Sequence, residues 1–272
     1  MSPAPRVTAF LVATFALSWF TWFGLVACAR FGLIEEDVPG RFYGWGGLAP
    51  SLVALLLAFR EGGWSGTKRL AARVLEWRVP ARWYLYAFLT PIVIRLLGIT
   101  LYTAEGGALR LPDINPVVIV LAFVIGLLVP LMEEYGWRGY LQPALRQRWS
   151  AASVGLVVGV AWWGWHIPLF WIEGTGLHQW GLISGIPLAL GGYAVSVISL
   201  SMLFTLMYEY TGGTLLLVFL LHTATNVSAD VFSSPYRNVG ETGPLWWSIV
   251  VIAAAGSLAA WMLQRSSRRT LA

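Results

Sequence analysis

Long apolar stretches alternate along the chain with short segments that hold most of the charged residues. A helix that crosses the hydrocarbon core of a bilayer needs about 20 mainly apolar residues. The apolar runs are continuous rather than alternating, so they predict helices and not the strands of a membrane β-barrel. The eight predicted spans cover residues 8–29, 44–60, 83–103, 116–141, 151–171, 184–208, 213–231 and 245–263.

The composition supports this interpretation. Of the 272 residues, 57% are hydrophobic and only 11% are charged, whereas a soluble domain has about 25% charged residues. Sixteen tryptophans are also typical of a bilayer protein, because indole rings favour the headgroup region. We therefore expect an all-α, polytopic membrane protein in which residues 1–272 form one membrane domain, without internal repeats or a separate soluble domain.

The charged segments between the spans alternate in sign. The positive-inside rule then predicts that both termini lie in the cytoplasm. The net charge of +5 follows from this topology and from contact with lipid headgroups, and nothing in the chain supports nucleic-acid binding. The basic segments hold Arg60, Lys68, Arg69, Arg73, Arg78 and Arg82, then Arg138, Arg146 and Arg148, then Arg265, Arg268 and Arg269; the alternate segments hold Glu35, Glu36, Asp37, Glu105, Asp113, Glu173, Asp230 and Glu241.

A single cysteine, Cys28, excludes an intramolecular disulfide. The residues before it, Leu25-Val26-Ala27, resemble a lipoprotein cleavage site. However, the apolar run from residue 7 is longer than the roughly 7–15 residues of a signal peptide, and Arg6 is its only basic flank. We therefore expect the first span to be retained as a membrane anchor.

Three predicted spans carry polar residues deep in apolar sequence: Glu133 and Glu134, then His166, then His222 with Asn226. An acid at the centre of a membrane helix costs about 2.5–3.5 kcal/mol on insertion scales, and such groups usually mark a functional site. A cost that recurs in three helices suggests the hypothesis that these side chains meet and carry out chemistry.

The spacing of Glu133 and His166 places them at a similar depth. The fourth and fifth spans form a predicted hairpin that turns near residues 149–150, and each side chain lies sixteen to seventeen residues from that turn. At a rise of 1.5 Å per residue, this is roughly 25 Å. Pro143 is expected to bend or break the fourth helix near Gln142.

The two adjacent glutamates receive different roles. Glu134 and Arg138 are four residues apart, so they share a helix face and can form an ion pair. Glu133 lies about 100° around the helix and is left without that partner. We assign Glu134 and Arg138 to structure and Glu133 to chemistry; the alternative is that all three form a charge cluster at the membrane interface.

Both histidines have a neighbour one turn away. Trp162 precedes His166 on the same face, and His222 shares a face with Asn226. Taken alone, His166 could be a hydrogen-bonded core residue. Likewise, His222 and Asn226 could join helices through hydrogen bonds worth about 0.6 kcal/mol on average.

Other features of the spans are weaker signals. Gly155 and Gly159 form a small-xxx-small pair that permits close helix packing. Arg95 is expected to snorkel or to form a salt bridge, with the wall of a substrate cavity as the alternative. His178 falls in a glycine-rich loop and is expected to face solvent, and Glu209 is expected at the membrane interface.

Three motifs in this order resemble those of the CPBP (CAAX protease and bacteriocin-processing) intramembrane proteases, a family that includes the Rce1-type prenyl-protein endopeptidases: Glu133-Glu134-x-x-x-Arg138, Trp162 with His166, and His222-x-x-x-Asn226. The resemblance covers about residues 117–230, with 1–116 as accessory helices and 232–272 as a final helix and basic tail. Trp162 stands where the family usually has Phe. This is a conservative aromatic change, so catalytic activity is still expected.

The resemblance implies a helical core around an intramembrane cavity that opens to the cytoplasmic side or to the membrane. By the same analogy, Glu133 and His166 would activate a water for attack on a peptide carbonyl. His222 and Asn226 would stabilise the developing oxyanion, and two such donors are worth about 3 kcal/mol each. The supporting residues would be Glu134, Arg138 and Trp162.

Two chemistries fit these residues. Glu133, His166 and His222 match a His₂Glu catalytic zinc site in ligand type. The alternative, which we favour, needs no cofactor: Glu133 and His166 share the water directly, while Asn226, a poor zinc ligand, binds the oxyanion.

The sequence thus predicts an intramembrane CAAX-type endopeptidase. Its expected partners are membrane lipid and a prenylated or otherwise hydrophobic peptide or protein substrate. A non-catalytic membrane partner, such as a bacteriocin-immunity protein, is the main alternative. A transporter is disfavoured because the chain lacks the inverted repeats and paired broken helices common in that class.

Overall fold

The computed structural model describes residues 3–269, with side chains described for residues 5–265, so that Arg268 and Arg269 of the basic tail lie outside the described side chains. Within residues 3–269 every regular element is helical and no strand occurs. The elements are α1 (Pro3–Arg30), α2 (Val38–Phe42), α3 (Gly44–Gly47), α4 (Ala49–Ala72), η1 (Arg73–Leu75), α5 (Ala81–Ala104), α6 (Pro116–Gly126), α7 (Leu128–Glu134), η2 (Tyr135–Leu141), α8 (Gln142–Arg146), α9 (Ala151–His166), η3 (Ile167–Trp171), α10 (Gly176–Ser184), α11 (Ile186–Tyr210), α12 (Leu215–Arg237) and α13 (Gly243–Arg269).

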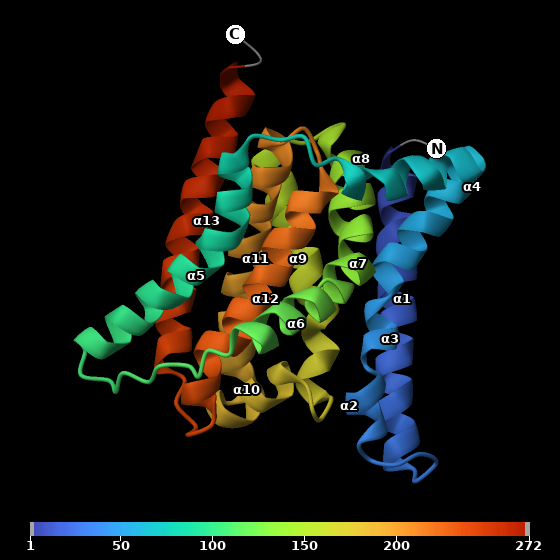
Figure 1. Cartoon of the computed structure of the whole chain (residues 1–272). Helices are drawn as coiled ribbons and strands as arrows, with labels where there is room; N and C mark the ends of the chain where they lie inside the picture. Colours follow the sequence, from blue (N-terminus) through green and yellow to red (C-terminus); the bar gives the residue numbers. More distant parts are fainter. Residues whose placement is uncertain (1–2, 270–272) are drawn as a thin grey trace.

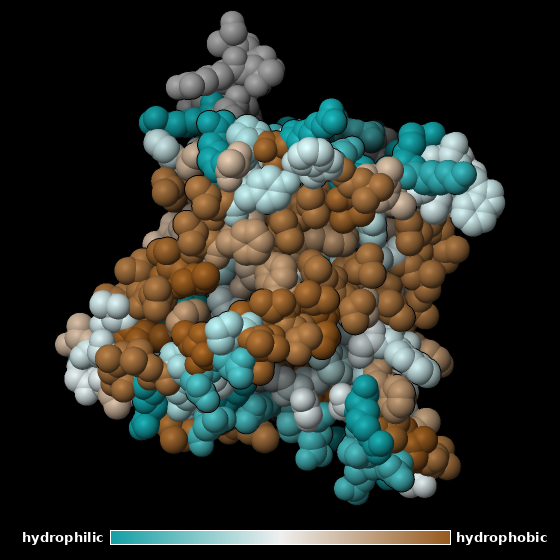
Figure 2. All heavy atoms as spheres, in the orientation of Figure 1, coloured by the Kyte–Doolittle hydropathy of each residue, from teal (hydrophilic) through white to brown (hydrophobic). Residues whose placement is uncertain are grey.

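Among the described residues, eight helical runs are long and apolar enough to cross a membrane. The described ends of α1 and α13 lie at the same end of the molecule, as an even number of crossings requires, and α10 lies at the opposite end (Figure 1). Figure 2 shows a broad hydrophobic band between two polar ends. The expectation of an all-α, multi-pass integral membrane protein is confirmed.

Pro143 was expected to bend or break the helix near Gln142, and no break occurs: one helical run continues from Pro116 to Arg146, although the helix changes from π to α at Gln142. A proline has no N–H to donate to the carbonyl four residues earlier, here that of Gly139. That carbonyl instead accepts a hydrogen bond from Nη1 of Arg73 at 3.1 Å. The preceding residues form the π-helix η2, whose wider turns shift the hydrogen-bond register ahead of the proline. An outside donor and a local change of helix type thus carry the chain through Pro143.

Helix α4 turns at Gly62 and Gly63, where φ of Gly63 is +57°. A positive φ of this kind is strained for residues with a side chain but not for glycine. The basic segment after the turn lies along the end of the bundle where α1 begins (Figure 1). The turn therefore brings Lys68 and its basic neighbours to the same end as the two termini.

Helices α9 and α11 approach closely at Gly155 and Gly159, as the small-xxx-small spacing predicts. A Cβ on Gly159 would lie 2.9 Å from the Cα of Ile198, so no larger residue fits without displacing the backbone. At Gly155 the carbonyl accepts a hydrogen bond from the hydroxyl of Ser201 at 2.8 Å. This packing holds the end of α9, which carries His166, against the middle of α11.

Candidate active site

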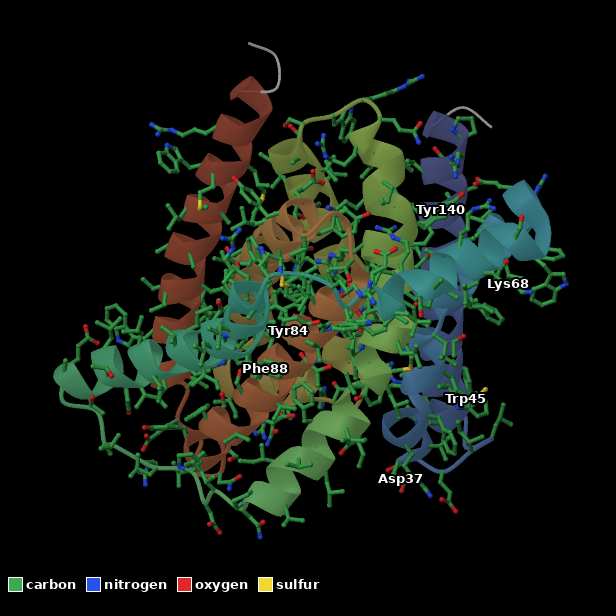
Figure 3. All side chains as sticks on the ribbon, turned by 45° about the horizontal axis from the view of Figure 1, so that its top comes forward. Asp37, Trp45, Lys68, Tyr84, Phe88 and Tyr140 are labelled. Carbon is green, nitrogen blue, oxygen red and sulfur yellow. The ribbon has the colours of Figure 1, made fainter. Side chains whose placement is uncertain are left out.

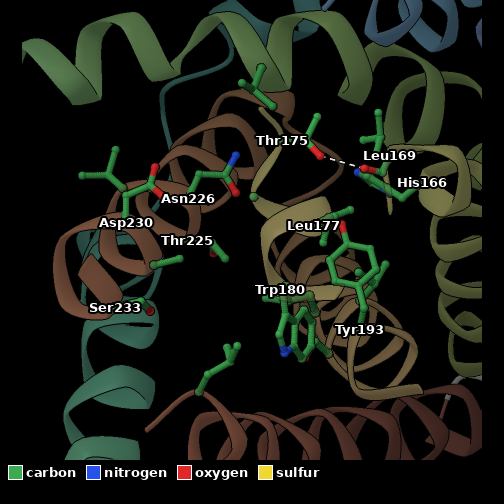
Figure 4. Close-up of a pocket in the computed structure, with 18 of the residues that line it drawn as sticks. His166, Leu169, Thr175, Leu177, Trp180, Tyr193, Thr225, Asn226, Asp230 and Ser233 are labelled. Atoms are coloured by element: carbon green, nitrogen blue, oxygen red, sulfur yellow. Dashed lines mark hydrogen bonds between the residues drawn. The ribbon is translucent and has the colours of Figure 1, made fainter. Parts of the chain in front are cut away.

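A cavity of about 590 Å³ lies among the membrane-spanning helices, in the half of the molecule that contains α10. Helix α7 contributes Glu133 to its wall, α9 contributes His166, and α12 contributes His222 and Asn226. Figure 4 shows Asn226 on one side of this cavity and His166 with Tyr193 on the other. The four residues for which the sequence predicts chemistry therefore line one space.

Glu133 is buried, with 5% of its surface exposed, and its Oε2 accepts a hydrogen bond from the indole Nε1 of Trp162 at 2.7 Å. The expectation that this carboxylate lacks the Arg138 partner holds, but it is not unpartnered. Oε1 accepts no hydrogen bond from any described residue. One oxygen is thus held by the protein, and the other is available to a water or substrate.

Glu134 lies outside the cavity lining and is fully buried. Both of its oxygens accept hydrogen bonds from Nη1 of Arg138, at 2.9 and 3.0 Å, so the expected ion pair is present. Its Oε1 also lies 2.7 Å from Nδ1 of His222. This second contact is not visible in helix spacing, because it joins residues 88 positions apart. Glu134 therefore connects the structural ion pair to a candidate site residue.

The guanidinium of Arg138 is fully buried, and its Nε and Nη2 have no hydrogen-bond partner. Its central carbon lies 4.4 Å from the ring centroid of Trp162 and 4.7 Å from that of Phe204. Aromatic ring faces attract a cation, and the attraction strengthens where water is excluded. The two rings therefore compensate in part for the missing hydrogen bonds of the guanidinium.

The hydrogen bonds of the two imidazoles define which nitrogens carry protons. Nδ1 of His166 lies 2.7 Å from the carbonyl oxygen of Trp162, which can only accept, so Nδ1 is the donor. In neutral His166 the other nitrogen, Nε2, is then a hydrogen-bond acceptor. Nδ1 of His222 faces Glu134, which already accepts from Arg138, and so Nδ1 of His222 also donates.

Of the remaining predicted positions, His178 differs from its expectation, and Arg95 takes the alternative place in the cavity wall. Asn226 is partly exposed in the cavity wall and makes no side-chain hydrogen bond with a described residue. Arg95 lines the same cavity, and no ion pair to it occurs within the described residues. His178 was expected to face solvent, but it is half-buried and its Nδ1 contacts the carbonyl of Phe170 at 3.0 Å. Glu209 pairs with Arg146 at 3.0 Å.

Sequence reasoning missed Tyr193 of α11. Its ring lies 5.3 Å from that of His166 in an edge-to-face arrangement, and it lines the cavity (Figure 4). In the sequence it is one aromatic residue in an apolar helix. Nothing in its spacing distinguishes it from the other tyrosines of the spans.

The predicted metal alternative can be compared with the donor arrangement. Among the described residues, no group of three or more His, Cys, Asp or Glu side chains is arranged to hold a metal ion. Glu133, His166 and His222 line one cavity, but their side chains do not form such a group.

In the cavity lining between α12 and α13, Glu241 accepts hydrogen bonds from Arg110, with Nη2 at 2.8 Å. This hydrogen bond with the guanidinium holds the pKa of Glu241 below its usual range. A charged pair therefore lies at this part of the lining, whereas most of the lining is apolar.

Comparison with known proteins supports the family resemblance that the three sequence motifs indicate. The family described as type II CAAX prenyl endopeptidase Rce1-like matches the chain over residues 115–228, from the start of α6 into α12. The chain is also similar to CAAX prenyl protease 2 of Methanococcus maripaludis, with 22% identity over 258 residues, which cover 90% of this chain and 91% of that protein. The resemblance seen in the motifs is confirmed: residues 115–228 match the Rce1-like CAAX prenyl endopeptidase family, and the similarity to the archaeal protease covers most of the chain.

Proposed function

We propose that this protein is an intramembrane endopeptidase that hydrolyses a peptide bond in a hydrophobic or lipidated peptide or protein. The observation that carries the proposal is that Glu133, His166, His222 and Asn226 line one cavity among the membrane-spanning helices. Intramembrane ionisable groups are costly unless they serve a function. The resemblance to the Rce1-like family and the protease name of the archaeal relative point to the same activity.

In the proposed mechanism, a water binds between the free oxygen of Glu133 and Nε2 of His166. Glu133 removes a proton as the water oxygen attacks the carbonyl carbon, and His166 accepts the second hydrogen bond and orients the water. The C–O bond forms, and the C–N bond then breaks. The proton held by Glu133 passes to the leaving amine nitrogen, which balances the reaction.

The oxyanion that forms during attack is assigned to His222 and Asn226. The side-chain amide of Asn226 donates one hydrogen bond. Since Nδ1 of His222 already donates to Glu134, His222 donates from Nε2 only as the doubly protonated imidazolium. Glu134 then stands between two cations, Arg138 and His222. With Glu133, the site holds two carboxylates and two cations, which limits the cost of burying the charges.

The mechanism is proposed to be metal-independent. A chelator should leave the activity of the purified protein unchanged. Activity that falls with chelator and returns with added zinc would contradict this assignment and favour the Glu133, His166 and His222 ligand set.

We also propose that both termini lie in the cytoplasm. The basic segments 60–82 and 146–148 lie at the end of the molecule that holds the termini, and the acidic loop residues 35–37 lie at the other end. Figure 3 shows Lys68 and Asp37 at these two ends. The excess of arginine and lysine at one end supports this orientation by the positive-inside rule.

The experiment for the enzymatic proposal is Glu133→Gln, assayed with a hydrophobic quenched-fluorescent peptide that the purified protein cleaves. General-base catalysis contributes about 10²–10⁴-fold, so a loss of that size is expected. Gln keeps an oxygen for the indole of Trp162, so folding should be retained. The matched control is Glu173→Gln, an exposed loop position outside the cavity. Unchanged cleavage by Glu133→Gln would remove the assigned base, and a loss of stability without any measurable wild-type cleavage would favour the non-catalytic alternative.

A further inference from the structure

The proposed mechanism leaves one charged residue of the cavity wall without a role. Arg95 lies in the membrane-spanning helix α5, more than two helical turns from either end, and it lines the same cavity as Glu133 and His166. Its side chain is half-buried and makes no hydrogen bond or ion pair with a described residue. A cation at this depth of a membrane helix is costly, and such groups usually mark the path of a substrate or ion.

Two guanidinium groups share one carboxylate in this part of the cavity. Asp230 of α12 interacts electrostatically with Arg95, but it forms its ion pair with Arg237, whose Nη1 lies 3.7 Å from Oδ1 of Asp230. The carboxylate of Glu241 is already held by Arg110. Among these described side chains, Arg95 is therefore the positive charge without a carboxylate of its own. An anionic group of a ligand would supply the missing partner.

The position of Asp230 relates Arg95 to the proposed oxyanion donors. His222, Asn226 and Asp230 follow each other at intervals of four residues on α12, and all three line the cavity. Figure 4 shows Asn226 and Asp230 along one wall, and α5, which carries Arg95, packs against α12. At 1.5 Å per residue, Asp230 lies about 6 Å from Asn226 and about 12 Å from His222 along the helix axis.

We infer that Arg95 binds the free α-carboxylate at the C-terminus of the peptide substrate, and so selects peptides that are cleaved close to that end. The inference rests on the proposed function. A guanidinium can donate two parallel hydrogen bonds to a carboxylate, which gives both affinity and orientation. The substrate is otherwise hydrophobic, so its terminal carboxylate is the anion that it brings into the cavity.

The spacing along α12 also sets the length of the released fragment. An extended peptide advances about 3.3 Å per residue. A carbonyl held by His222 and Asn226, and a carboxylate held by Arg95 near Asp230, are therefore separated by about two to four residues. Arg95 acts as a specificity residue in this arrangement, because it contacts the end of the substrate and not the reacting atoms.

The test compares two hydrophobic quenched-fluorescent peptides that differ only at the C-terminus, which is a free carboxylate in one and a carboxamide in the other. Both dyes are attached through side chains, so that the terminus stays accessible. The wild-type protein should cleave the acid with a kcat/KM about 10–100-fold above that of the amide, because the amide lacks the hydrogen bonds between charged groups.

This preference should disappear in Arg95→Gln, for which the two peptides should have a similar kcat/KM. Arg95→Lys keeps the charge but loses the paired N–H groups, so an intermediate preference is expected. The matched control is Arg82→Gln, an exposed position near the start of the same helix and outside the cavity lining. This control should keep the wild-type preference.

Equal cleavage of the two peptides by the wild-type protein would overturn the inference. A purely structural role for Arg95 would lower cleavage of both peptides alike and leave their ratio unchanged, and that result in Arg95→Gln would overturn it as well. If Arg95→Gln does not fold, an unchanged ratio in Arg95→Lys has the same meaning.

Binding separates this inference from the enzymatic proposal, because it needs no catalysis. The same peptides are titrated into the Glu133→Gln variant in detergent and followed by calorimetry. Tighter binding of the acid, lost when Arg95→Gln is added, supports the role of Arg95 even if the wild-type protein cleaves neither peptide, a result that would contradict the proposed function alone. Equal binding of acid and amide would overturn the inference whether or not cleavage occurs.

Discussion

Two groups of polar side chains meet at Trp162, and they differ in how completely they are sealed. Glu134 and Arg138 are fully buried, pair with each other and do not line the cavity. Glu133 is adjacent in sequence, yet it lines the cavity and keeps one oxygen free of protein partners. One short stretch of helix thus supplies two different groups. Glu134 and Arg138 form a fully buried ion pair, which we call the closed layer, whereas Glu133 belongs to the open group that lines the cavity. The difference shows that burial of a charge in a membrane helix does not by itself identify a catalytic group.

What distinguishes the two groups is how many of their hydrogen-bonding positions the protein already occupies. The carboxylate of Glu134 accepts hydrogen bonds from Arg138 and His222, so it has little capacity left to bind a substrate. The carboxylate of Glu133 accepts a hydrogen bond only from the indole of Trp162 among the described residues. The comparison predicts that substitutions in the closed layer reduce stability, whereas substitutions in the cavity reduce activity.

The largest effect on stability is expected for Arg138→Met. Removing one partner of a buried ion pair leaves an uncompensated charge and costs about 3–5 kcal/mol. The midpoint of thermal unfolding in detergent should fall strongly, together with the yield of monodisperse protein. Glu133→Gln, measured in the same way, is the control from the open group. If Arg138→Met unfolds at the wild-type temperature, the closed layer does not stabilise the fold.

The next effect, on activity alone, is expected for Asn226→Ala. Loss of one oxyanion donor lowers kcat by about 10²–10³-fold. Because Asn226 makes no side-chain hydrogen bond with a described residue, the unfolding temperature should stay near that of the wild type. Steady-state cleavage and thermal unfolding of the same preparation separate the two readouts. A variant that loses stability but cleaves normally would place Asn226 in the structural group.

The smallest effect is expected for Gly159→Ala at the contact of α9 with α11. The added Cβ would meet the backbone of Ile198 at 2.9 Å, and overpacking of this kind costs about 1–3 kcal/mol. Gly191→Ala is the matched control, since a Cβ there meets nothing within 4 Å and alanine favours a helix by about 0.5–1 kcal/mol over glycine. Opposite shifts in the unfolding midpoint are expected. Equal shifts would show that close packing of these helices does not contribute to stability.

Features that depend on residue spacing within one helix could be predicted from the sequence. The Glu134–Arg138 pair follows from a spacing of four residues, and the capacity of α9 for close packing at Gly155 and Gly159 follows from the same spacing of small residues. Which side chains of different helices meet could not be predicted in this way. The bond from Trp162 to Glu133 and the contact of His222 with Glu134 depend on how each helix is rotated and tilted against its neighbours. Continuation through Pro143 likewise depends on Arg73, a donor 70 positions earlier in the chain.

The eight membrane spans, and the presence of the candidate polar groups in three of them, could be predicted from the residues alone. Bilayer thickness and helix periodicity impose both features locally, whatever the neighbouring helices do. Which glutamate faces the cavity, how Tyr193 joins its wall and which half of the bundle holds the cavity could be known only from the folded chain. These features follow from the packing of distant segments around Trp162, because hydrogen-bond partners and open space are properties of several helices together.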